Sequence, residues 1–258
     1  MPDISVTEPE KIDGQRVPYG KRTIGTENPE KMTSEEFMNS KELLFHGSGI
    51  PFSYDLNFKY DSDFYKTFDG SLTLGTGFYS TPNKDQAENY SQERQVGTEG
   101  KSLNVIAVLP KKAEMLDLRG KNTLQENAPI PKELFEKWRE KFVRYYKDQD
   151  KNSIPWYEDK FQKSYLEHLD KLAEFPDIDL RSMLWTGGDE RTHDGWYPSP
   201  TWVDLFAQFM RDEGYDGVIY IEGGEGQKGE SSPTYCFFNT GVVDTYEGWQ
   251  MRKSEATK

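Results

Sequence analysis

The chain has 258 residues, of which 34% are hydrophobic, 30% are charged and 14% are aromatic. Its formal net charge is −13 at pH 7, whereas proteins that grip nucleic acid through its phosphates are normally basic. Charge therefore argues against nucleic acids and anionic membranes as partners, but it leaves room for a small anionic ligand in a local pocket. The aromatic content predicts a folded core rather than a disordered chain.

The sequence offers little material for disulfides, metal centres or targeting segments. Cys236 is the only cysteine, which excludes an internal disulfide and a cysteine-rich zinc site. His46, His168 and His193 lack the spacing of a histidine metal site, so we expect no metal. No apolar run approaches the roughly 20 residues of a membrane helix, and residues 1–35 lack a secretory h-region. We expect a cytoplasmic protein, or an effector translocated without a cleaved signal peptide.

The first 35 residues are polar and lack a periodic apolar face, which predicts an extension of the chain outside the main domain. Residues 33–36 form a capping-box pattern, which predicts a short helix that carries Phe37. The following run at residues 41–45 predicts a strand that enters a turn at residues 46–49.

Hydrophobic periodicity predicts the later elements, because β-branched runs favour strands and apolar residues every third or fourth position favour helices. The expected strands are residues 104–109, 115–118, 217–221 and 234–239, and the expected helices begin near Pro131, Pro155 and Ser199. Gly214 is expected to end the last of these helices.

Strands thus precede and follow a helical block, an arrangement typical of an α+β domain. We expect one domain over residues 36–250, with a helical insertion at about residues 120–176. Residues 1–35 form the N-terminal polar extension, and residues 251–258 form a C-terminal tail.

The segment Leu43–Ser48 (LLFHGS) ends an apolar strand in a histidine, a glycine and a hydroxyl group. A glycine at such a position lets a ligand approach the backbone closely and bind its N–H and C=O groups. The imidazole of His46 and the hydroxyl of Ser48 suit the hydroxyl groups of a sugar. An ordinary turn with a half-buried histidine gives the same pattern.

A second segment, GTGFYSTPNKDQAENY, runs from Gly75 to Tyr90. It predicts a strand that carries Tyr79, a turn, and a helix that opens near Asp85 and carries Tyr90 on its second turn. Two tyrosines placed in this way can converge on one flat ligand, although two core aromatics also fit. The chain contains neither GxGxxG nor GxxxxGK[ST], so the common nucleotide-binding folds are not indicated.

Together the two segments resemble the signatures of the ADP-ribosyltransferase superfamily, on its poly(ADP-ribose) polymerase-like (H-Y-E) side. LLFHGSG is similar to the first signature, and the spacing of eleven residues from Tyr79 to Tyr90 is similar to the second. GYDGVIY, a loop and TYCFFN also resemble the end of phage and bacterial members. The resemblance covers about residues 41–91 and 213–243, and it implies a split β-sheet core around an NAD cleft.

The resemblance also implies a role for each matching residue. His46 would bond the adenosine ribose hydroxyls of NAD, Gly47 would hold the nicotinamide amide through its backbone, and Ser48 would contact the ribose side. Tyr79 and Tyr90 would bracket the nicotinamide ring. Such a site fixes a strained ribose and holds the leaving ring while the bond between them breaks.

The chain departs from the family pattern at the catalytic carboxylate. The family's glutamate on the last strand aligns with Thr234, which can only hydrogen-bond. Glu230, just upstream, is the first substitute, and Glu222 and Glu225 lie in the same loop. Family members without this glutamate tend to add single ADP-ribose units or to be inactive, so chain growth is not expected.

A second departure is Ala87, where family members often carry a serine that bonds the nicotinamide amide. Glu136 and Glu158, on the expected helices, are further carboxylate candidates, but charged helical residues mostly face water.

The function implied by the resemblance is a mono-ADP-ribosyltransferase that moves one ADP-ribose from its co-substrate NAD to a target macromolecule, here a protein side chain. The acidic surface and the insertion would select a target with a basic face. Two alternatives stay open: a catalytically silent module that binds NAD, ADP-ribose or a protein, and an NAD glycohydrolase with water as acceptor. The charge of −13 disfavours the related transfer of a 2′-phosphate from RNA.

Overall fold

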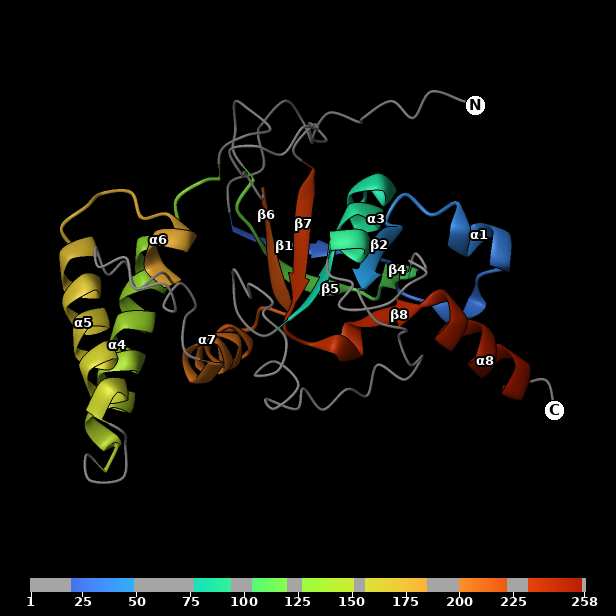
Figure 1. Ribbon diagram of the computed structural model, residues 1–258. Coiled ribbons are helices and arrows are strands. Elements are labelled where there is room, and N and C mark those ends of the chain that lie inside the picture. Colours follow the sequence, from blue (N-terminus) through green and yellow to red (C-terminus); the bar gives the residue numbers. More distant parts are fainter. Residues whose placement is uncertain are drawn as a thin grey trace.

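The computed structural model describes residues 20–48, 77–93, 104–119, 127–150, 156–184, 200–221 and 232–256. In these residues two β-sheets and seven α-helices form a mixed α+β fold (Figure 1). The α+β class expected from the sequence is therefore confirmed. Among the described helices, none has both the length and the apolar character that crossing a membrane requires.

The strands form one sheet of five and one sheet of three. They are β1 (Gly20–Ile24), β2 (Leu44–Ser48), β3 (Phe78–Ser80), β4 (Asn104–Pro110), β5 (Ala113–Asp117), β6 (Gly217–Ile221), β7 (Pro233–Phe237) and β8 (Val243–Thr245). The larger sheet has the order β1-β5-β6-β7-β3, and the smaller sheet has the order β2-β4-β8. The two sheets meet at an isolated bridge between Phe45 and Thr81, which exchange backbone hydrogen bonds of 2.7 and 2.9 Å.

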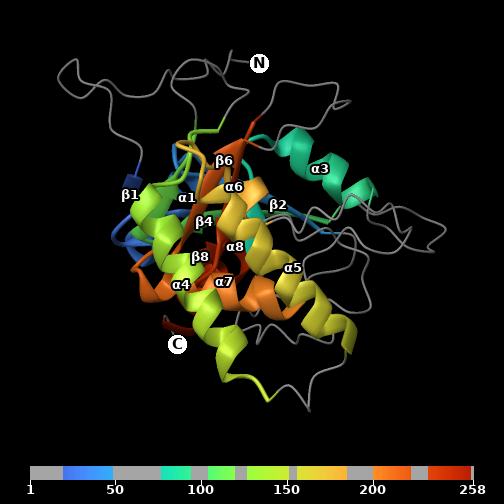
Figure 2. The same ribbon diagram turned by 90° about the vertical axis from the view of Figure 1, so that its left-hand side faces the viewer.

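The helices cover both ends of this arrangement. They are α1 (Ser34–Met38), α3 (Lys84–Glu93), α4 (Lys132–Asp148), α5 (Trp156–Leu172), α6 (Leu180–Leu184), α7 (Pro200–Asp212) and α8 (Tyr246–Ala256). Helices α4 to α7 stand on one side of the five-stranded sheet, whereas α1 and α8 lie beside the three-stranded sheet (Figures 1 and 2). Helix α3 packs on β2 and β4.

The larger hydrophobic core lies between the five-stranded sheet and helices α4 to α7. Trp138 packs edge-on against Phe206, with ring centroids 5.3 Å apart, and donates from Nε1 to the hydroxyl of Tyr165 at 2.9 Å. That hydroxyl donates in turn to the carbonyl of Met183 at 2.6 Å. The buried polar atoms of these aromatic side chains are thus satisfied, as a tightly packed core requires.

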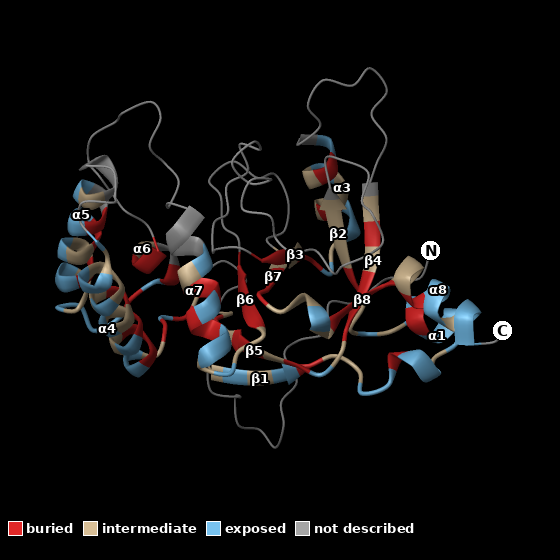
Figure 3. Ribbon diagram, turned by 90° about the horizontal axis from the view of Figure 1, so that it is seen from below, coloured by how far each residue is buried: buried red, intermediate tan, exposed pale blue. Residues whose placement is uncertain are grey.

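Two smaller cores lie beyond it. One fills the space between the two sheets with apolar side chains of Leu44, Phe78, Ile106, Val108, Met115, Ile219 and Phe237, among others. The other joins Phe37 of α1, Leu109 of β4 and Trp249 of α8. Buried residues gather in the central strands, whereas exposed residues line the outer faces of α4, α5 and α8 (Figure 3).

Most of the expected elements are confirmed. Thr33 caps α1 with a complete capping box, and the three predicted helices appear as α4, α5 and α7. Gly214 follows α7 with a φ of 79°, a left-handed conformation that glycine adopts without strain. Strand β6 has the predicted bounds, and all its residues are buried.

Three expectations were wrong in part. Gly20–Ile24, placed in the polar extension, forms the edge strand β1, where only Ile24 is buried. Residues 46–48, expected in a turn, continue β2 because they pair with residues 104–106 of β4. The expected C-terminal tail continues helix α8 as far as Ala256.

Asp216 ties three strands of the larger sheet together. Its carboxylate accepts from the backbone N–H of Glu114 at 2.9 Å and from the side-chain amide of Asn239 at 2.8 Å. We predict that Asp216→Ala lowers the free energy of unfolding by on the order of 3 kcal/mol, because both donors lose a charged acceptor. Urea denaturation measures this change, and Asp148→Ala, at an exposed helix end, should shift stability by less than about 0.5 kcal/mol. Equal effects of both substitutions would show that the hydrogen bonds of Asp216 do not stabilise the sheet.

Candidate functional site

Strands β2 and β3 separate directly beyond the bridge that joins the two sheets. On one strand, the backbone groups of residues two apart point to the same edge, so Gly47 directs its N–H and C=O toward β3 as Phe45 does. Among the described residues, none across this gap bonds to the Gly47 backbone. Gly47 therefore presents a hydrogen-bond donor and an acceptor where the sheets part.

Packing explains why residue 47 is a glycine. A Cβ at this position would lie 1.8 Å from the carbonyl oxygen of Ala87 and 3.1 Å from the backbone nitrogen of Ser91, both on helix α3. The backbone of α3 therefore lies directly against the backbone of β2. Tyr90, on the same helix, is half-buried.

His46 spans the gap with its side chain. Its Nδ1 lies 2.6 Å from the carbonyl oxygen of Tyr79, and because a carbonyl can only accept, Nδ1 carries the proton. The ring stacks on Phe78 with centroids 4.4 Å apart. Burial lowers the pKa of His46, against the smaller opposing effect of its bond to Tyr79. The lowered pKa favours the neutral imidazole, in which Nδ1 carries the proton and Nε2 is the acceptor nitrogen.

The strand register divides the predicted residues between two faces of the sheet. Residues directly opposite each other share a face, and Tyr79 pairs with Cys236, so Tyr79 lies on the same face as Cys236 and Thr234. The bridge at Phe45 places the Cα of Gly47 on that face too. His46 points to the opposite face, as its stacking on Phe78 shows.

The structure brings some of the predicted residues together. Gly47, Tyr79 and the helix that carries Tyr90 surround the gap, and His46 bonds the Tyr79 backbone across it. Thr234 lies on β7, the strand next to β3, where its side chain is only 3% exposed. A glutamate at that position would therefore be a buried carboxylate.

Several candidates fall elsewhere. Ser48 ends β2 opposite Asn104, but its side chain is not among those described. Glu222, Glu225 and Glu230, like the side chain of Glu158, lie outside the described residues. Glu136 pairs with Arg139 on the solvent side of α4 at 3.5 Å, as expected for a helix-surface residue.

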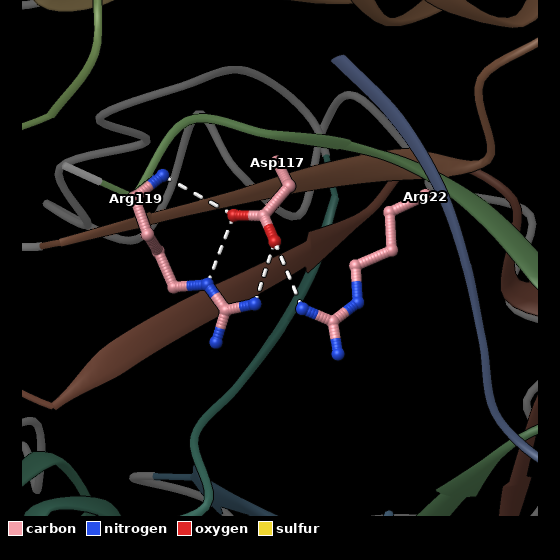
Figure 4. Close-up of polar contacts among 3 residues, drawn as sticks. All are labelled: Arg22, Asp117 and Arg119. Carbon is pink, nitrogen blue, oxygen red and sulfur yellow. Dashed lines mark hydrogen bonds and ion pairs between the residues drawn. The ribbon is translucent and has the colours of Figure 1, made fainter. Parts of the chain in front are cut away.

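A polar cluster that no sequence motif predicts lies on the His46 face of the larger sheet. It consists of Arg22 of β1, Asp117 of β5 and Arg119, which follows β5 (Figure 4). The only signal in the sequence was an Asp-x-Arg pair after an apolar strand. Arg22 is 95 residues away in sequence from Asp117, so no local pattern predicts its contribution.

Comparison with known proteins gave no match: no protein-family model, no curated protein and no solved structure matches this chain. We therefore infer the function from the geometry and chemistry of the chain's own residues.

The contact between Gly47 and Ala87 yields the first prediction for the site. Gly47→Ala should destabilise the protein by about 1–3 kcal/mol, because the new methyl group must push α3 away from β2. Thermal unfolding measures the loss. Gly20→Ala is the comparison variant. A Cβ there meets nothing within 4 Å, so any loss of stability reports the backbone φ of 152° at Gly20 and not a steric clash. Unchanged stability of the Gly47 variant would contradict the packing described here.

The lowered pKa of His46 yields the second prediction. Below the ordinary histidine pKa of about 6.5, the unfolded chain binds the proton more readily, so stability present above that pH is lost as the pH falls through the folded pKa. His46→Asn keeps an N–H donor for the Tyr79 carbonyl but cannot titrate. The advantage of the wild type over this variant should therefore shrink between pH 7.5 and pH 5 in urea denaturation. Parallel stability–pH profiles of the wild type and the variant would contradict a lowered pKa of His46.

Proposed function

We propose that this protein is a mono-ADP-ribosyltransferase that transfers one ADP-ribose from NAD to a protein side chain and releases nicotinamide. The single observation that carries the proposal is the gap between β2 and β3, into which Gly47 directs a backbone donor and acceptor. A carboxamide such as that of nicotinamide needs one acceptor and one donor in this arrangement. The residues present thus fit the nicotinamide end of NAD.

The neighbouring side chains support the same proposal. Tyr79 lies on β3 and Tyr90 on α3, and we assign their rings the role of holding the flat nicotinamide ring between them. The Tyr79 carbonyl holds His46, and burial, by lowering its pKa, favours the neutral ring. We assign its imidazole the role of binding a sugar hydroxyl. These groups bind and orient, and they account for a site that positions a sugar and its leaving ring.

Transfer also requires stabilisation of the positive charge that develops on the ribose, which the family's carboxylate provides. Thr234 carries no charge, and its side chain is buried, so it cannot provide this stabilisation. We propose Glu230 for this role, because it lies three residues before β7 in the sequence. The carboxylate would then come from the loop rather than from the strand.

The threonine at position 234, in place of a carboxylate, also favours a second candidate function. If no carboxylate reaches the gap, the same geometry describes a module that binds NAD or ADP-ribose without transfer. NAD glycohydrolysis, with water as the acceptor, differs from both in releasing nicotinamide without modifying a macromolecule.

We predict that the wild-type protein, incubated with NAD and a cell lysate, adds one ADP-ribose mass to a lysate protein and releases nicotinamide. Glu230→Gln should lower the rate by at least about 100-fold, because a neutral amide cannot stabilise the developing charge. Glu225→Gln in the same loop is the matched control and should retain activity. Mass spectrometry of the lysate proteins and chromatography of nicotinamide provide the two readouts.

The outcomes separate the three functions. Nicotinamide without adducts would establish the glycohydrolase, and bound but intact NAD would establish the silent module. Loss of activity in Glu225→Gln rather than Glu230→Gln would move the carboxylate role along the loop. A wild-type protein that neither binds nor cleaves NAD would refute the proposal.

Binding is tested separately at Tyr90. Tyr90→Ala should weaken NAD affinity by about 1–3 kcal/mol, the contribution of one stacking contact, whereas Tyr90→Phe should retain it. Isothermal titration calorimetry measures both affinities. If the two substitutions behave alike, the Tyr90 ring does not stack on the ligand.

A further inference from the structure

A row of side chains crosses the five-stranded sheet on the face where His46 lies. Ser80 of β3 pairs with Tyr235 of β7, Tyr235 pairs with Ile219 of β6, and Ile219 pairs with Asp117 of β5. Directly paired residues share a face, and the Phe45–Thr81 bridge puts His46 beside Ser80 at the end of this row. The row thus runs from His46 to the arginine cluster, and most of its members are polar.

Two arginines converge on one carboxylate at the far end of the row. Arg119 donates to Asp117 from its backbone nitrogen, from Nε at 2.9 Å and from Nη2 at 2.5 Å. Arg22 adds only one long bond, from Nη1 at 3.3 Å (Figure 4). Burial alone would raise the pKa of Asp117, but the hydrogen bonds and charge of Arg119, together with the charge of Arg22, lower it. Asp117 is therefore ionised and already satisfied by Arg119 alone.

The cluster holds more donors than acceptors. Nη1 of Arg119, together with Nε and Nη2 of Arg22, donates to no described residue, and the two side chains are 28% and 39% exposed. The Tyr235 hydroxyl likewise has no described partner. Ser80, which pairs with Tyr235 across β3 and β7, is only 3% exposed. Its hydroxyl has no hydrogen-bond partner among the described residues.

The strand register places Tyr235 on the same face of the sheet as Asp117, with β6 between their two strands. Burial raises the pKa of Tyr235, whereas Arg119 acts to lower it, so the phenol stays protonated and can donate at neutral pH. Glu42, before β2, is the other acidic group that acts on both Tyr235 and Arg119. The negative charge of Glu42 partly offsets the positive charge of Arg119, so it would weaken the attraction of an anion to the cluster.

We propose that Arg22, Arg119 and Tyr235 form a binding site for a phosphoryl oxyanion, with Asp117 as the residue that positions the two guanidinium groups. The planar fork of arginine matches two phosphate oxygens, and the site offers only donors to a ligand. The phosphoryl group has two sources: the diphosphate of a dinucleotide bound at His46, or a separate phosphorylated molecule. The proposal concerns oxyanion binding and does not depend on ADP-ribose transfer.

Inorganic pyrophosphate is the probe, titrated into the full-length protein by calorimetry without NAD. Arg22→Gln should weaken pyrophosphate binding by about tenfold or more, the effect of one charge-assisted hydrogen bond, and Tyr235→Phe should weaken it by about fivefold. Glu42→Gln should tighten it by about twofold, because the opposing charge is removed. Arg144→Gln is the matched control, since this arginine is 76% exposed on α4, and it should leave binding unchanged.

The proposal is overturned if the wild type does not bind pyrophosphate at millimolar concentration, or if Arg22→Gln and Arg144→Gln bind it equally well. Arginine side-chain NMR provides a second readout, because the Nε–H signals of Arg22 and Arg119 should shift on titration while that of Arg144 should not. Circular dichroism confirms that each variant is folded before its affinity is compared.

A parallel titration with NAD distinguishes the two sources. A weaker NAD affinity in Arg22→Gln assigns the site to the diphosphate of the dinucleotide, and an unchanged NAD affinity assigns it to a separate phosphorylated molecule. Pyrophosphate binding in a protein that leaves NAD intact would support this site while refuting the proposed transfer. NAD cleavage without pyrophosphate binding would do the reverse.

Discussion

The arrangement of the candidate site depends on the close contact between Gly47 and the Ala87 carbonyl. This contact lets helix α3, which carries Tyr90, lie against the backbone of β2. The single bridge at Phe45 then determines where β2 and β3 part. A larger residue at position 47 would push α3 away from β2 and so change the arrangement of the site.

Much of the fold could be predicted because its signals are local. The apolar run of β6 and the periodic stripes of α4, α5 and α7 depend on neighbouring residues alone. Strand β1 was missed because an edge strand with one buried residue, Ile24, lacks a hydrophobic pattern. The division of His46 and Tyr79 between two faces was also missed, since a face is set by the register between strands distant in sequence.

The candidate residues show the same contrast. Two short motifs predict His46 and Gly47 on a strand and Tyr90 on a helix. In the structure these residues lie on β2 and α3, which pack against each other. The cluster of Arg22, Asp117 and Arg119 was not expressed in any motif, because it assembles from β1 and β5 only when the sheet forms. It also shows how a chain of net charge −13 can hold locally concentrated donors, because a short-range site depends on nearby groups more than on total charge.

We propose that the Gly47 backbone binds the carboxamide of nicotinamide in the gap between β2 and β3. The most direct measurement is the 1H–15N spectrum of protein labelled at glycine, titrated with NAD. We predict a large downfield shift of the Gly47 amide proton, as expected for a new hydrogen bond, with a smaller change at Gly214, beyond α7. Saturable NAD binding that leaves the Gly47 amide unmoved would rule out this contact.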